Sequence, residues 1–65
     1  MLINNIRINR HCLEQVALQL INIINAWQIV EFHKIMDWKA HATVNPQRVI
    51  NEIVEVLKTV KERAN

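Results

Sequence analysis

Apolar side chains recur at helical spacing along the first two thirds of the chain, and neither proline nor glycine interrupts residues 10–45. At about 100° per residue, one side of such a helix gathers an apolar stripe. The stripe contains Leu13, Val16, Ala17, Leu20, Ile24, Trp27, Ile35 and Trp38. Asn9 is a suitable N-cap, because its side chain can accept a hydrogen bond from a free amide of the first turn. The pattern predicts one helix over 10–38, with a break near Glu31 as the alternative, because Glu31 and Lys34 interrupt the stripe.

The pair Asn45–Pro46 marks the start of a second helix. Asparagine is a favoured N-cap, and proline is favoured at the first helical position, where its missing amide needs no partner. Beyond it, apolar residues alternate at spacings of three and four: Ile50, Ile53, Leu57, Val60 and Ala64. We therefore expect a helix over 46–64 and a turn over 39–45.

The first nine residues follow a different pattern. Ile6 and Ile8 alternate with the polar residues Asn5, Arg7 and Asn9, which indicates a short extended arm. The whole sequence thus predicts a single all-α domain over 1–65. Its expected architecture is an antiparallel helical hairpin, with a long first helix, a shorter second helix and the arm over 1–9.

The first expected helix is too apolar to be covered by the second. No charged residue occurs between Gln15 and Val30, and a helix that is apolar around most of its circumference is buried on more than one side. A second copy of the chain is the simplest cover, so we expect a homodimer with a four-helix arrangement. The residues expected at this contact are Leu13, Val16, Leu20, Ile23, Ile24 and Trp27. By their helical positions, Trp27 and Trp38 are expected to pack in the core.

Composition excludes several classes of protein. The chain has 65 residues and a net charge of +2. It contains neither glycine nor serine, and its single cysteine, Cys12, cannot form an internal disulfide. Gly-rich phosphate loops, serine nucleophiles and paired-cysteine zinc sites are therefore impossible. We expect Cys12 to be a small buried residue, and His33, Asp37 and His41 to form a solvated polar face without a metal. No cofactor, enzymatic activity or membrane segment is expected, and the predicted location is the cytoplasm.

These features favour a non-enzymatic interaction module that self-associates and binds or regulates a partner protein. Phe32 and Met36 lie to one side of the expected core stripe. Exposed aromatic and methionine side chains are typical of protein-binding surfaces, so this pair is the candidate contact with another chain. An enzyme accessory subunit, a metal-binding protein and an inhibitor carried by a virus or plasmid remain open alternatives.

The principal alternative is a dimeric DNA-binding regulator. An alternating N-terminal segment followed by two helices resembles the ribbon-helix-helix repressors, whose paired strands enter the major groove. That resemblance implies that Asn5, Arg7 and Asn9 face the bases, with Arg10 nearby, and that Asn45 at the start of the second helix contacts phosphate. The chain departs from that family in its longer first helix and in the absence of a glycine-bearing turn.

Overall fold

The computed structural model describes residues 9–64 and contains three α-helices. They are α2 (Arg10–Trp27), α3 (Phe32–His41) and α4 (Pro46–Ala64). Residues 9–64 contain no strand, so the all-α class is confirmed for this part of the chain. Nearly all of the expected extended arm, residues 1–8, lies outside the described residues.

Two asparagine caps begin α2 and α4 at the positions that the sequence predicts. The Asn9 side-chain oxygen accepts a hydrogen bond from the amide of Cys12 at 2.8 Å. Asn45 accepts one from the amide of Arg48 at 3.2 Å, and Pro46 occupies the first position of α4. Each cap satisfies one of the backbone amides that have no partner in the first turn of a helix.

The continuous helix expected over 10–38 is wrong, because α2 ends at Trp27. Gln28 adopts a left-handed conformation with φ of 56°, and its amide donates to the carbonyl of Asn25. The amide of Ile29 then donates to the carbonyl of Ile24. These two bonds form a Schellman motif, a common helix ending that usually has glycine at the left-handed position. The actual break therefore falls just before Glu31, which is the N-terminal cap residue of α3.

The connection between α3 and α4 is shorter than expected. α3 continues to His41, so the turn covers 42–45 and not 39–45. The carbonyl of His41 accepts hydrogen bonds from the amides of Val44 and Asn45. The guanidinium group of Arg10 donates to the carbonyls of Thr43 and Val44, the latter at 2.7 Å. This contact attaches the start of α2 to the turn before α4.

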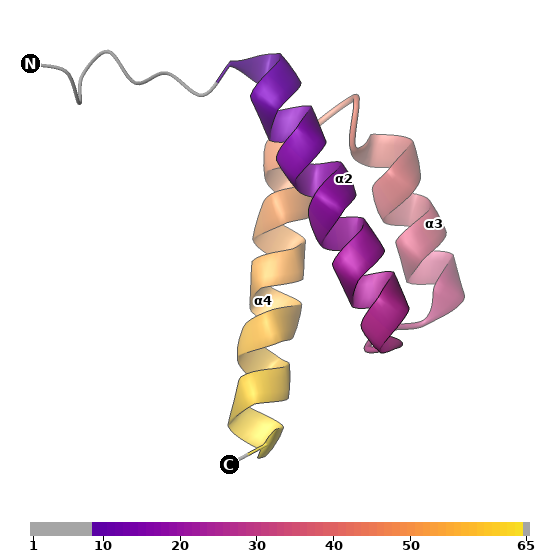
Figure 1. Ribbon diagram of the computed structural model, residues 1–65, viewed down its shortest axis with the longest axis vertical. Helices are drawn as coiled ribbons and strands as arrows, with labels where there is room; N and C mark the ends of the chain where they lie inside the picture. The colour runs from indigo at the N-terminus through magenta and orange to yellow at the C-terminus, as the bar shows by residue number, and fades with distance from the viewer. Residues whose placement is uncertain (1–8, 65) are drawn as a thin grey trace, which may run out of the picture.

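Successive helices run in opposite directions, and α4 packs along α2 while α3 lies on the other side of α2 in the view of Figure 1. The core lies where the three helices meet. It contains Ala17, Ile21 and Ile24 from α2, Ile35 and Trp38 from α3, Ala42, and Val49 and Ile53 from α4. The C-terminal turns of α4 extend beyond the end of α2 (Figure 1). Part of the apolar side of α4 is consequently left without a covering helix.

Candidate interaction surface

One side of α2 carries a row of apolar side chains that the single chain does not bury. The members recur at alternating spacings of three and four residues, as at the contact of two packed helices. They are Leu13, Val16, Leu20, Ile23 and Trp27, which we call the α2 row. Val16 and Ile23 are each 43% exposed and Trp27 is 63% exposed, whereas Leu13 and Leu20 are half-buried. The row is thus a continuous apolar strip open to another molecule.

Two residues of α2 differ in burial from what the sequence predicted: Ile24 is buried, and Trp27 is exposed. Ile24 belongs to the core of the single chain and is only 1% exposed, so it is not available for contact with a second copy. Trp27 is exposed, so the expectation that it packs in the core is wrong; Trp38, for which the same was expected, is buried. Trp27 is the last residue of α2 and lies on the α2 row, away from the core face of the helix.

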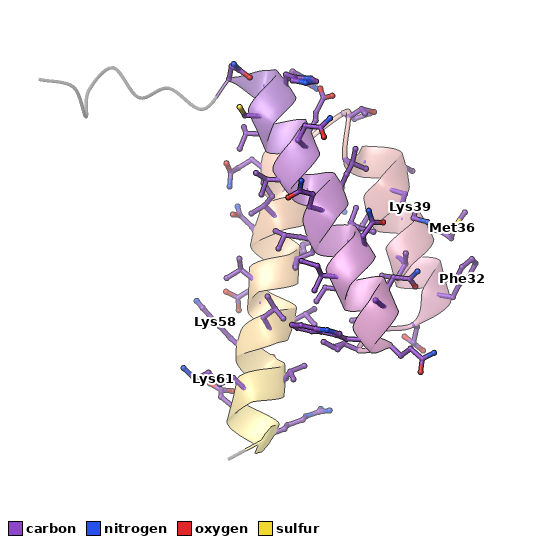
Figure 2. The ribbon with its side chains drawn as sticks, viewed as in Figure 1. Phe32, Met36, Lys39, Lys58 and Lys61 are labelled. Carbon is purple, nitrogen blue, oxygen red and sulfur yellow. The ribbon has the colours of Figure 1, made fainter. Side chains whose placement is uncertain are left out.

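Phe32 and Met36 form a second exposed apolar surface, on α3. Both side chains project outward from α3, on the side away from α2, and Lys39 follows them one turn later (Figure 2). Their spacing of four and then three residues places all three on neighbouring positions of one helix face. The structure therefore brings together the two residues predicted to contact a partner, and it separates them from the α2 row.

A shallow groove of about 380 Å³ lies between the start of α3 and the C-terminal half of α4. Its apolar lining consists of Ile29, Val56 and Val60, and charged or polar side chains surround these: Lys34, Glu52, Glu55, Thr59 and Arg63. Sequence reasoning missed this groove. It exists because α2 ends at Trp27 and α4 continues past it, and the pattern gives no direct signal of either relation.

A hydrogen-bonded network joins α3 to α4 beside this groove. The indole nitrogen of the buried Trp38 donates to Glu52 Oε1 at 2.9 Å, and Arg48 Nε donates to Glu52 Oε2 at 2.8 Å. The hydrogen bond from Trp38, followed by that from Arg48, holds the pKa of the Glu52 carboxyl below its usual value. Because Glu52 is already bound on both oxygens within the chain, its contribution is structural.

The polar residues considered for metal chemistry are not assembled into a site. His33 is exposed and lies 3.5 Å from the Glu31 carboxylate, whereas His41 is partly buried and its Nδ1 has no partner within the described part of the chain. No group of three or more metal-ligating side chains comes together in residues 9–64. Cys12 is exposed, contrary to the expectation that it would be buried.

Of the residues considered for DNA contact, Asn5 and Arg7 lie outside the described residues. Asn9 uses its side chain to cap α2, and Arg10 donates to two backbone carbonyls and pairs with Glu14 at 3.4 Å. Asn45 likewise caps α4. These three side chains therefore already have partners within the fold.

Within the part of the chain that the structure describes, no helix combines the length and the apolar character that crossing a membrane requires. Comparisons of the chain with protein-family models, curated proteins and solved structures found no match.

Proposed function

We propose that this chain is a small non-enzymatic helical interaction module that self-associates through the α2 row. The observation that carries the proposal is the exposure of Val16, Ile23 and Trp27 on one continuous side of α2. Apolar surface of this extent is costly to leave in water, since each buried methylene group stabilises a contact by about 0.8 kcal/mol. A chain this short also has a small core, and self-association is a common source of additional stability.

A second copy of the chain is the partner that the charge pattern favours. No residue from Gln15 to Val30 is charged, so two identical α2 rows can meet without bringing like charges together. The residues beside the row, Gln19 and Ala26, are also uncharged. A row that recognised a charged partner would be expected to carry complementary charges along its margin, because these determine partner choice in helical contacts.

Sedimentation equilibrium over a concentration series tests this proposal. The intact chain is expected to sediment as a dimer at tens of micromolar, and Ile23→Asp is expected to sediment as a monomer with unchanged helical circular dichroism. Ile23 is half exposed in the single chain, so the new carboxylate reaches solvent in the monomer but is desolvated at the contact. Asn22→Asp is the matched control, because it places the same charge on an exposed position of α2 away from the row. A monomeric intact chain would refute the proposal.

Binding of a different protein is assigned to the surface of Phe32 and Met36. This surface lies on α3 and not on the α2 row, so both contacts can form at the same time. Phe32→Ser is therefore expected to reduce capture of a purified partner while leaving dimer formation intact. The two surfaces are independent only if Ile23→Asp shows the opposite result, with loss of the dimer and retention of capture.

The DNA-binding alternative is tested by titrating fluorescent duplexes at several salt concentrations. An interaction module is expected to bind them weakly and without sequence preference, given a net charge of only +2. Sequence-selective binding in physiological salt that Arg7→Ala abolishes would favour the regulator instead.

A further inference from the structure

We infer that the two copies meet with their α2 helices antiparallel, so that Trp27 of each copy packs on Val16 of the other. This inference rests on the proposed self-association through the α2 row and adds the orientation and the pairing of its residues. Three features of α2 carry it: the spacing of the row, the sizes of its side chains and the direction of the helix.

The spacing of the row permits an antiparallel pairing of four of its five members, all except Leu13. When two helices with a three-four repeat pack antiparallel, residues of one spacing class face residues of the other. One such alignment places Val16 opposite Trp27 of the second copy and Leu20 opposite Ile23 of the second copy. By symmetry the same two pairs occur twice, so all four side chains are covered by apolar neighbours. Val16, Ile23 and Trp27, the most exposed members of the row, are among them.

The side-chain sizes also favour this orientation. Of the four paired residues, the first, Val16, has the smallest side chain, and the last, Trp27, has the largest. An antiparallel contact places the large Trp27 against the small Val16 at both ends. The distance between the two helix axes is then nearly uniform along the contact. A parallel contact would place Trp27 on Trp27 at one end and Val16 on Val16 at the other. The helices would then be held apart at one end, and the gap would lower the packing density that stable interfaces require.

The third feature is the helix dipole of α2, which its own side chains do not offset at the ends. The first turn contains no acidic residue and the last turn contains no basic one. The partial positive charge at the N-terminus and the partial negative charge at the C-terminus therefore remain. In an antiparallel pair, the two N-termini lie at opposite ends of the contact, and so do the two C-termini. A parallel pair would instead bring the two N-termini, with their partial positive charges, to the same end of the contact.

Disulfide trapping distinguishes the two orientations. In a Cys12→Ala background, Gln19→Cys and Ala26→Cys each introduce one thiol at an exposed position beside the row. In the proposed alignment, position 19 of one copy and position 26 of the other lie about 3 Å apart along the helix axis. Two copies of position 19 are then about 7.5 Å apart along the axis, and two copies of position 26 about 13.5 Å. In a parallel pair, the margin with positions 19 and 26 lies on opposite sides of the contact in the two copies, so neither like nor mixed thiols come within reach of each other.

The two variants are mixed, oxidised mildly and separated by mass, with each variant alone as the control. The expected main product is the disulfide between the two different variants, formed about tenfold faster than either self-linked product, because disulfide geometry tolerates little displacement. A dimer in sedimentation that gives no mixed product, or mainly self-linked products, would overturn the proposed antiparallel alignment while leaving self-association intact. A monomer in sedimentation, with no linked product, would overturn both the proposed function and the inference.

Discussion

The two apolar sides of α2 have opposite environments, although the residues that form them are nearly the same. Ile21 is completely buried against α3 and α4, whereas Ile23, two residues later, is 43% exposed. Ala17 and Ile24 share the environment of Ile21, and Val16 and Trp27 share that of Ile23. A helix with apolar residues on two sides can therefore bury one side within its own chain and leave the other side free to contact a second molecule.

The two tryptophans repeat this contrast between different helices. Trp38 lies in the core with its indole nitrogen bonded to Glu52, and Trp27 lies at the end of α2 with most of its surface exposed. A large side chain in the core stabilises the single chain, and a large exposed one stabilises contact with a partner. Matched substitutions at buried and exposed positions test this division between the two kinds of apolar residue.

The largest effect is expected from a pair of matched truncations in α2. Ile21→Ala removes a fully buried side chain and is expected to reduce the free energy of unfolding by about 2–5 kcal/mol. Ile23→Ala removes the same atoms from an exposed position and should cost less than about 1 kcal/mol in the monomer. Chemical denaturation at low protein concentration gives both values. Equal losses would mean that the two sides of α2 do not differ as described.

The two tryptophans allow a second matched comparison. Trp38→Phe removes the hydrogen bond to the Glu52 carboxylate and is expected to cost about 1–2 kcal/mol of stability. Trp27→Phe should leave the stability of the single chain nearly unchanged, since its indole is not in the core. Thermal unfolding followed by circular dichroism measures both. A larger loss for Trp27→Phe under monomeric conditions would reverse the assignment of the two residues.

The substitution Gln28→Gly tests the C-terminal end of α2. Gln28 has φ of 56°, where a side chain costs about 1 kcal/mol relative to glycine. Glycine at this position is therefore expected to stabilise the chain by about 1 kcal/mol and to raise the midpoint of thermal unfolding. Gln15→Gly, in the exposed interior of the same helix, should have the opposite sign. A destabilised Gln28→Gly variant would indicate that α2 does not end there.

The smallest effect is expected from the titration of Glu52. Its pKa is lowered in the fold, so the unfolded chain binds the proton more readily. The resulting stabilisation is present above the pKa of the unfolded glutamate and is lost as the pH falls through the lowered value. The loss should be below about 1 kcal/mol, because the carboxylate is partly exposed to solvent. Denaturation at acidic and neutral pH measures it, and Glu52→Gln should lose this component of the pH dependence.

The starts of α2 and α4 could be predicted from local sequence. Asn9 and the pair Asn45–Pro46 supply local chemistry that begins a helix wherever it occurs, and the hydrogen bonds to Cys12 and Arg48 confirm both caps. The all-α class follows from apolar periodicity in the same way. These features depend on neighbours within one or two turns, so no tertiary contact is needed to predict them.

The tertiary structure alone decided where the first expected helix breaks and which of its apolar sides is buried. Gln28 carries no breaking signal, and its left-handed conformation is maintained by packing that places Ile29 against the core and α3 beside α2. That break moves Ile35 and Trp38 onto a separate helix, where they cover Ile21 and its neighbours and leave the α2 row exposed. The hydrophobic effect favours burial of apolar surface but is not directional. Which of two apolar sides of a helix is buried therefore depends on how the other helices pack against it.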